Sequence, residues 1–537
     1  MSKLPDPIRQ GLARGWKVVG GPHGPLPAQL DCDVVIVGTG AGGGITAELL
    51  ARAGLDIVMV EAGPLKSSSD FRQLESEAYP SLYQESAARK TADKAITILQ
   101  GRCVGGSTTV NWTSSFRTPE ATLRWWGEQY GLGELSPEAM APWFAQAERR
   151  LQIGPWQVPP NENNEVLKRG CEKLGLSAAA IPRNVSGCWN LGSCGMGCPT
   201  NAKQSMLVTT VPAALDQGAR LLVETQALRF EHDGRRISAL LCAPAAAAPA
   251  SARPAVRIRA RHYVLSGGAI NSPALLLRSD APDPHGRLGL RTFLHPVLIS
   301  AATFGQPVQA WQGAPQSVYS DHFLSTQPID GPLGYKLEAP PLHPVLFGSS
   351  LPAHGQARHE LMADFPHTQA LIALLRDGFH KRSIGGRVSL HNDGSPVLDY
   401  PLDETVLEGA RRALLTMAEI QFAAGAQKVL PVHEQARPYT SWAEAREAIG
   451  RLEMAPYQTH VVSAHVMGGC GLSGDPRLGV VRSDGRHWQL DNLSVHDGSL
   501  FPTSIGANPQ LSIYGLTWRL ATGLAQRLGA KQPVLVS

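Results

Sequence analysis

Residues 32–62 read CDVVIVGTGAGGGITAELLARAGLDIVMVEA, and this stretch decides the fold. A run of β-branched residues comes first, a glycine-rich turn follows, and residues 45–54 have helical spacing and end on a glycine that can stop the helix. A second apolar run, residues 56–63, predicts another strand. Strand, helix and strand make one unit of a parallel sheet, which predicts an α/β fold.

The glycines of this turn predict a dinucleotide site. Gly38, Gly40 and Gly43 form G-x-G-x-x-G, which permits a tight turn and lets a pyrophosphate approach the backbone at the positive end of the helix. Glu61 follows Gly38 by 23 residues, where a carboxylate can accept hydrogen bonds from a ribose hydroxyl. Nicotinamide and flavin proteins share this unit, so it does not choose between the two cofactors.

Composition excludes several classes of protein. The 537 residues contain 49 Lys and Arg against 45 Asp and Glu, and this near balance argues against a nucleic-acid-binding protein. The eight cysteines are too few for a disulfide scaffold, and no secretory leader opens the sequence. The longest apolar runs fall far short of the ~20 residues that span a bilayer. We therefore expect a cytoplasmic protein.

Residues 6–19, DPIRQGLARGWKVV, predict a short basic amphipathic helix, because Ile8, Leu12 and Trp16 recur every four positions among basic residues. Two interpretations stay open. The segment is an N-terminal arm packed on the protein, or it makes peripheral contact with the anionic surface of the inner membrane, with Trp16 at the interface.

Later segments change character. Residues 385–402 hold two short alternating runs around an Asp-Gly turn, which indicates an antiparallel hairpin. The Ala/Pro-rich residues 243–255 predict a solvent-facing hairpin tip, and residues 511–529 predict a closing helix. We predict an N-terminal arm (1–30), a dinucleotide-binding domain in three segments (31–130, 205–300 and 455–537) and a second, substrate-binding domain in two (131–204 and 301–454).

Three further blocks carry chemistry. Residues 101–119, GRCVGGSTTVNWTSSFRTP, combine paired glycines with small hydroxyl residues and one Asn, which suits backbone amides that line a planar ring. Residues 267–279, GGAINSPALLLRS, again combine paired glycines with small hydroxyl residues and one Asn, and Pro273 is placed to open a helix. The third block begins with SAHVMGGC at residue 463 and continues through DGSLFPTSIGANP at 497–509.

Together with the glycine turn, these blocks resemble the glucose-methanol-choline oxidoreductase family, in the family's order and from Asp31 to about Ala521. The resemblance implies FAD as the cofactor. It also implies the fold of cholesterol oxidase and glucose oxidase, in which a Rossmann-like FAD domain built from several segments joins a substrate domain with an antiparallel sheet and helices. The motif style is similar to bacterial long-chain alcohol oxidases and to cholesterol oxidase.

The resemblance also implies site residues. His465 falls on the family's catalytic His, and Asn508 falls on the second catalytic position. A neutral imidazole, with an ordinary pKa near 6.5, can take the hydroxyl proton as hydride leaves the carbon, while the amide holds the oxygen. Choline-type members carry a covalent flavin bond on a His at the position of Val110, so we expect non-covalent FAD. The implied flavin contacts are Gly105, Gly106 and Asn111 along the ring, and Asp497 and Gly498 near the ribityl chain and pyrophosphate.

The expected function is oxidation of a rather apolar primary or secondary alcohol to the aldehyde or ketone. Electrons then pass to oxygen, or to a quinone or cytochrome. A hydroxynitrile lyase of the same fold, which keeps FAD without net electron transfer, remains the alternative.

Three nearby thiols, Cys188, Cys194 and Cys198, leave two alternatives: an iron–sulfur cluster, or reduced thiols with at most one disulfide. Only three thiols are local and the usual C-x-x-C steps are missing, so we predict no metal. We interpret His496 as structural, because on an alternating strand it points away from Asp497.

Overall fold

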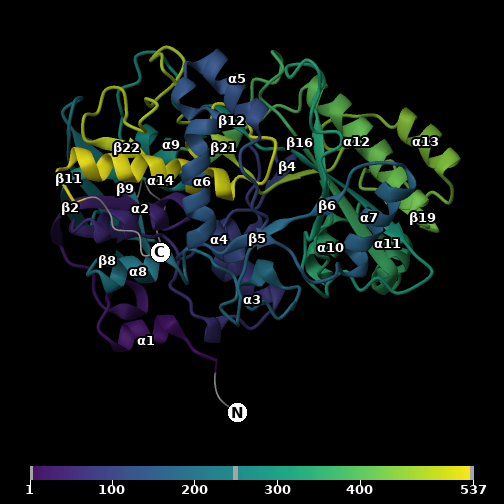
Figure 1. Ribbon diagram of the computed structural model, residues 1–537, viewed down its shortest axis with the longest axis horizontal. Coiled ribbons are helices and arrows are strands. Elements are labelled where there is room, and N and C mark those ends of the chain that lie inside the picture. Colours follow the sequence, from purple (N-terminus) through teal and green to yellow (C-terminus); the bar gives the residue numbers. More distant parts are fainter. Residues whose placement is uncertain (1–3, 246–251, 532–537) are drawn as a thin grey trace.

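The computed structural model describes residues 4–245 and 252–531. Two lobes, each built on a large sheet, lie side by side (Figure 1). Helices α2 (Ala41–Arg52) and α14 (Gln510–Arg527) mark the first lobe, and α12 (Glu404–Ala423) and α13 (Trp442–Arg451) mark the second. Each lobe has its own apolar core.

The first sheet contains the predicted strand–helix–strand unit. Strands β2 (Gln29–Val37) and β3 (Ile57–Val60) pair in parallel, with α2 between them along the chain. The order of the sheet is β1-β8-β3-β2-β11-β10-β9, and β22 also pairs with β11. The remaining strands are β1 (Lys17–Val19), β8 (Arg220–Leu222), β9 (Thr225–His232), β10 (Ile237–Pro244), β11 (Val256–Leu265) and β22 (Leu493–Val495).

Strands β10 and β11 are antiparallel neighbours, as the Ala/Pro-rich connection between them predicts. Residues 246–251 of the predicted tip lie outside the described residues.

Helices cover this sheet. Helix α14, the predicted closing helix, packs on α2 and on α6 (Pro137–Arg150), and α2 also packs on α8 (Thr210–Asp216). Helix α9 (Gly268–Arg278) contacts β9. Two further helices of the chain are α4 (Ser107–Val110) and α5 (Glu120–Tyr130).

The prediction that Pro273 opens a helix was wrong, because α9 begins at Gly268 and contains Pro273. The helix begins upstream because the Asp497 carboxylate accepts hydrogen bonds from the Gly268 N–H and the Ser272 hydroxyl. Pro273 has no N–H, so the helix lacks one backbone hydrogen bond, the one to the Ala269 carbonyl. The Asp497 carboxylate still holds the first turn.

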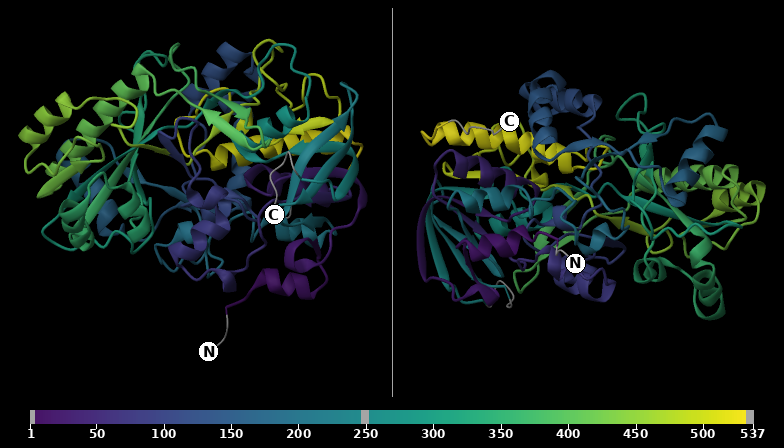
Figure 2. Two further views of the ribbon diagram at one scale, coloured as in Figure 1. Left: turned by 180° about the vertical axis from the view of Figure 1, so that it is seen from behind. Right: turned by 60° about the horizontal axis from the view of Figure 1, so that its bottom comes forward.

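The second sheet is mostly antiparallel, with the order β4-β20-β13-β16-β15-β14-β6, and β19 also pairs with β13. Helices α7 (Glu162–Lys173), α12 and α13 lie on this lobe together with the short helices α10 (Pro344–Ser350) and α11 (Gly355–Ala363), as two views show (Figures 1 and 2). The strands are β4 (Ile96–Ile98), β6 (Ala179–Ala180), β13 (Val297–Thr303), β14 (Val318–Ser320), β15 (Tyr335–Glu338), β16 (Thr368–Leu375), β19 (Lys428–Pro431) and β20 (Val461–Ser463).

The sheets cross the predicted segment boundaries. Strands β4 and β20 fall in segments that we assigned to the FAD domain, yet they belong to the second sheet. Strand β1, within the predicted arm, is an edge strand of the first sheet. A strand of three residues carries too little periodicity to reveal which sheet it joins.

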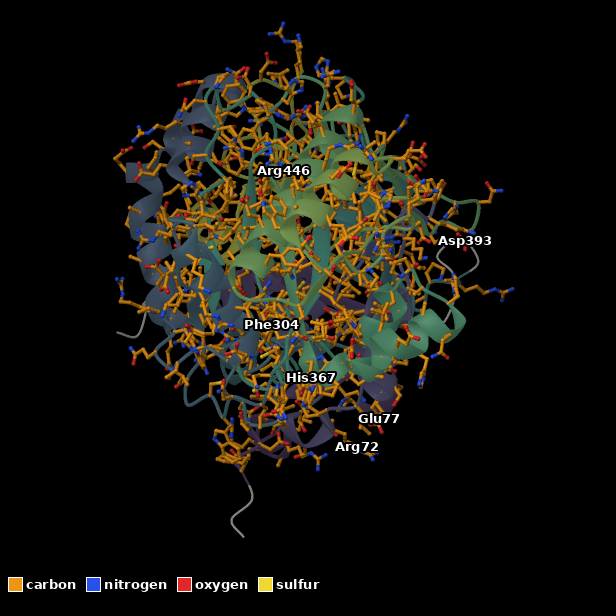
Figure 3. All side chains as sticks on the ribbon, turned by 90° about the vertical axis from the view of Figure 1, so that its right-hand side faces the viewer. Arg72, Glu77, Phe304, His367, Asp393 and Arg446 are labelled. Carbon is orange, nitrogen blue, oxygen red and sulfur yellow. The ribbon has the colours of Figure 1, made fainter. Side chains whose placement is uncertain are left out.

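A four-stranded sheet contains the hairpin predicted around the Asp-Gly turn, β17 (Gly386–Leu390) and β18 (Pro396–Asp399). Asp393 marks that turn at the edge of the molecule in Figure 3. Strands β12 (Leu290–Phe293) and β21 (Met467–Gly468) complete this sheet, and β5 (Ile153–Pro155) pairs with β7 (Pro182–Asn184) elsewhere.

The N-terminal segment packs on the first lobe. Helix α1 (Pro7–Ala13) buries Ile8, and the Trp16 indole N–H donates to Asp216 on α8 at 2.7 Å. Arg14 pairs with the same carboxylate at 3.1 Å. These contacts favour the packed-arm interpretation. Within the described ranges, no helix has the length and apolar character needed to cross a membrane.

Candidate active site

A cavity of about 870 Å³ runs between the two lobes. Residues from the ends of β2 and β3 line one part, and residues of β13 and β16 line another. Most of the predicted site residues meet here: Gly38, Gly40, Glu61, Gly106, Asn111, His465, Asp497, Gly498 and Asn508.

Glycines form a backbone cradle at the start of α2. Gly38 has φ +97°, and a Cβ there would lie 2.3 Å from the Ser266 carbonyl oxygen. Gly40 and Gly106 approach each other so closely that a Cβ on Gly106 would lie 2.9 Å from the Gly40 Cα. A side chain would fill this space, so the cradle suits a group that binds through backbone N–H groups, such as a pyrophosphate.

Two residues predicted to contact the cofactor, Gly43 and Gly105, are not among the described residues that line the cavity. A Cβ on Gly43 would lie 2.0 Å from the Gly38 carbonyl oxygen, so this glycine permits close packing between the helix and the turn. Gly105 has φ +87° and supports the turn that presents Gly106.

Two buried carboxylates tie the cofactor loops together. Glu61 accepts hydrogen bonds from the Thr39 N–H and hydroxyl and from the Gly63 N–H. Asp497 joins the start of α9 to the loop after β22, because it also accepts from the Ser499 N–H at 2.8 Å. Burial raises the pKa of both carboxyl groups. The ribose and ribityl contacts of these residues stay predictions.

His465 follows β20 and lines the cavity, where its side chain is half-buried. Its Nδ1 lies 3.1 Å from Nδ1 of His295, which is fully buried. Burial lowers the pKa of His465 to about 4. The imidazole is therefore neutral near pH 7 and can accept a proton.

Asn508 lines the same cavity, and a hydrogen bond to the buried Glu338 orients its side-chain amide. Its Nδ2 donates to Glu338 Oε2 at 3.1 Å, and its buried Oδ1 has no hydrogen-bond partner among the described residues. Glu338 shares one side of β15 with Lys336, whose ammonium lies 3.5 Å from the centre of the Phe116 ring. Burial raises the pKa of Glu338, and the Lys336 ammonium opposes that rise.

Models of the GMC oxidoreductase family match residues 79–297 and 382–517, which together are more than half of the chain. The chain belongs to the GMC oxidoreductase family. The family resemblance and the fold class predicted from the sequence are thereby confirmed.

Relatives of this GMC oxidoreductase are similar along most of their length. An uncharacterized GMC-type oxidoreductase of Mycobacterium tuberculosis is 31% identical over 501 residues, which cover 92% of this chain and 76% of that protein. A long-chain-alcohol oxidase of Arabidopsis thaliana is 27% identical over 523 residues, covering 94% of this chain and 70% of that protein.

Solved structures share the fold. Pyridoxine 4-oxidase from Mesorbium loti has a TM-score of 0.68 at 18% identity, covering 92% of this chain and 99% of that chain. A formate oxidase variant from Aspergillus oryzae, solved to study FAD modification, has a TM-score of 0.67 at 15% identity, covering 94% and 99%.

This GMC protein is an FAD-dependent oxidoreductase that acts on CH–OH donors. FAD, when bound, supplies the hydride acceptor. The residues present fit it, because the Gly38, Gly40 and Gly106 backbones leave a cradle free of side chains beside the start of α2.

A buried lysine that the sequence did not reveal fixes the loop of the GMC cavity that holds Asn111. The Lys203 ammonium donates to the backbone carbonyls of Thr109, Asn111 and Cys194 at 2.9, 2.6 and 2.7 Å. The Asn111 amide donates to Gln510 at 2.7 Å. Lys203 belongs to the sequence AKQS at residues 202–205. Its role could not be predicted, because it depends on contacts with Thr109 and Asn111, which are far away along the chain.

Two other sequence predictions concern residues outside the cavity lining. The thiols of Cys188, Cys194 and Cys198 are free, and the described part of this GMC chain has no group of three or more His, Cys, Asp or Glu side chains that could hold a metal ion. The free thiols fit the reduced-thiol interpretation. His496 contacts the Thr46 hydroxyl at 2.9 Å, as a structural residue should.

Proposed function

We propose that the protein oxidises a rather apolar primary or secondary alcohol to the aldehyde or ketone, with His465 as the base and Asn508 as the group that holds the alcohol oxygen. One observation carries the proposal: both side chains line one cavity, and that cavity continues over an apolar floor.

The floor is formed by facing residues of β13 and β16. Val297 lies opposite Leu374, Ile299 opposite Ile372, and Ala301 opposite Ala370. Val297 also pairs with Val462, three residues before His465, so the floor begins beside the base. At ~3.3 Å per residue, β13 runs roughly 13 Å from residue 297 to residue 301.

This length and polarity support an alcohol with an extended apolar chain. The floor residues Val297, Ile372 and Leu374 form a small apolar cluster of their own, and α10 residues such as Leu346 also line the cavity. The long-chain-alcohol oxidases of Arabidopsis thaliana among the relatives support the same class of substrate.

The proton chemistry falls to His465 and Asn508. Neutral His465 accepts the hydroxyl proton as the C–H hydride leaves. The Asn508 amide uses one N–H on Glu338, which leaves the other N–H to stabilise the charge that develops on the alcohol oxygen.

The cofactor is bound without a covalent link in this proposal, because Val110, which lines the cavity, has no nucleophilic atom. Electrons leave to oxygen, or to a quinone or cytochrome. Peripheral membrane contact through the N-terminal arm would bring the protein close to a membrane quinone. In the structure, the Trp16 and Arg14 side chains donate hydrogen bonds to Asp216, so such contact would have to break them or leave them in place. Sedimentation with anionic vesicles tests that contact.

Anaerobic mixing with aliphatic, aromatic, terpenoid and sterol alcohols tests the reaction. We expect loss of the yellow flavin absorbance with at least one apolar alcohol, and a ~100- to 10,000-fold slower loss in His465→Ala that retains FAD. Oxygen and quinone analogues added afterwards identify the acceptor. Persistent colour with cyanide release from a cyanohydrin would support the lyase, and a normal rate in His465→Ala would reject the base.

A further inference from the structure

His295 contacts His465 from outside the cavity lining. The two Nδ1 atoms are 3.1 Å apart, and the rings are tilted by only 28° with centroids 5.3 Å apart. His295 is fully buried, whereas His465 lines the cavity. With its Nδ1 on His295, His465 has only its Nε2 left to meet a substrate.

The fold holds both imidazoles in place. His295 lies between β12 and β13 with φ +48°, and its backbone N–H donates to the buried Asp377 carboxylate at 3.1 Å. Asp377 also accepts from the Tyr400 hydroxyl at 2.7 Å. On the other side, the Ser463 hydroxyl donates to the Leu294 carbonyl and accepts from the His465 N–H. The chain before His295 and the chain before His465 are thus joined through Ser463.

Two facing Nδ1 atoms at this distance require one proton between them, because two lone pairs repel and two N–H groups clash. A neutral imidazole carries its proton on one nitrogen only. For His465 to accept a proton at Nε2, its own proton has to be on Nδ1. His295 Nδ1 is then the acceptor, and the proton of His295 lies on its Nε2, which is buried with no hydrogen-bond partner among the described residues.

We propose that His295 is a positioning residue, which accepts the hydrogen bond from His465 Nδ1 and so selects the tautomer with a free Nε2. This inference rests on the proposed function, in which His465 is the base. When the alcohol O–H bond breaks, its proton forms the N–H bond at Nε2 and the electron pair stays on oxygen. The His465 Nδ1–H bond to His295 then becomes charge-assisted and stabilises the imidazolium.

The surroundings keep His295 neutral and therefore able to accept. Its burial, the neighbouring His465 and the Lys336 ammonium all lower the pKa of His295 well below its ordinary value. A proton on His465 therefore does not move on to His295.

Paired substitutions test the role. His295→Asn places Oδ1 where Nδ1 stood, and Asn tolerates a positive φ. His295→Leu removes the acceptor. Since a hydrogen bond to a charged group contributes ~1.5–3 kcal/mol, we expect the rate constant of flavin reduction at saturating alcohol to fall about 10- to 100-fold in the Leu variant and to recover most of that loss in the Asn variant. Equal loss in both variants, or no loss in the Leu variant, would overturn the proposal.

Controls separate chemistry from folding. FAD content and the thermal midpoint are measured for each variant, beside His262→Leu, which removes a buried histidine of β11 that contacts Ser494 and should leave the reduction rate unchanged. If His295→Leu does not fold, NMR of the wild-type holoenzyme with ¹⁵N-histidine decides instead, with His465→Ala for assignment.

The expected NMR result is a protonated Nδ1 and a bare Nε2 on His465, and the reverse would overturn the proposal. This measurement needs no substrate. Failure of every alcohol to reduce the flavin would reject the proposed function. The NMR measurement would still show which nitrogen of His465 carries the proton.

Discussion

At the scale of single residues, the protonation state of His465 determines the pH profile that we expect if His465 is the base. Burial lowers the pKa of His465 to about 4, so the base is neutral over the whole physiological range and becomes protonated only in acid. We therefore expect kcat/KM for alcohol oxidation to be flat between about pH 6 and 8 and to fall below about pH 5. A fall in kcat/KM centred near the ordinary pKa of 6.5 would contradict the lowering of the His465 pKa by burial.

Asn508 gives a second residue-scale prediction, because its amide donates to a carboxylate. Asn508→Asp would place two carboxyl groups in contact, and like charges at that distance force them to share one proton. At low pH the shared proton restores a hydrogen bond between residue 508 and Glu338. As the pH rises, this proton is lost and the two carboxylates repel each other. We expect flavin reduction in this variant to slow with increasing pH, where the wild type stays flat. Parallel profiles for the two proteins would refute this expectation.

His465 and Asn508 could be predicted because each stands inside a contiguous block of sequence. Their partners could not, since His295 and Glu338 lie 170 residues away from them along the chain. Lys336 and Glu338 alternate along β15, a pattern that usually indicates a solvent-facing side of a strand. Here the side is buried, and only the strand pairing and the contact with Asn508 reveal it.

At the scale of elements, the start of α2 depends on a glycine that meets another backbone. A Cβ on Gly42 would lie 1.5 Å from the His496 carbonyl oxygen, and neither backbone can yield without moving α2 or the end of β22. We expect Gly42→Ala to lower both FAD content and the thermal midpoint, consistent with an overpacking cost of ~1–3 kcal/mol or more.

The matched control for that change is Gly450→Ala. Gly450 lies in α13, and apart from its chain neighbours and its own helix backbone no atom of the described residues lies within 4 Å of an added Cβ. Alanine there should therefore preserve FAD content and slightly stabilise the helix. Equal behaviour of the two variants would show that the contact with His496 does not constrain the glycine turn.

The apolar floor supplies the next element-scale prediction. Ala370 and Ala301 face each other at the end of the floor remote from Val462. Ala370→Leu should fill that end, so kcat/KM should fall at least ~10-fold for long-chain alcohols and change little for short ones. The short alcohols are the internal control. A uniform decrease across chain lengths would show instead that the substitution disturbs the site as a whole.

Long periodic elements were predictable and short ones were not. The unit β2–α2–β3, the hairpin β17–β18 and the helix α14 all follow from apolar spacing or turn residues. Strands β4 and β20 have three residues each, and their membership of the second sheet depends on pairing with each other and with β13. Local sequence also could not reveal that Asp497 anchors α9 upstream of Pro273.

At the scale of the whole molecule, the cavity joins two lobes that have separate apolar cores. Val60 and Gly38 line it from the first sheet, and Val297 and Ile372 line it from the second. A cofactor bound here contacts both lobes, so its binding free energy opposes the opening of either one. Unfolding of the holoenzyme should therefore be more cooperative than unfolding of the apoprotein.

FAD binding and release test this coupling together with the proposed non-covalent binding of FAD. Denaturation followed by ultrafiltration should leave the yellow colour in the filtrate, since Val110 offers no atom for a covalent bond. Adding FAD back to the refolded apoprotein should raise the unfolding midpoint with FAD concentration, by an amount equivalent to ~2.7 kcal/mol at 100 times Kd. Calorimetry should then show one transition in place of two. Colour retained on the denatured protein would contradict the non-covalent link, and a transition that FAD does not move in one lobe would show that the lobes unfold independently.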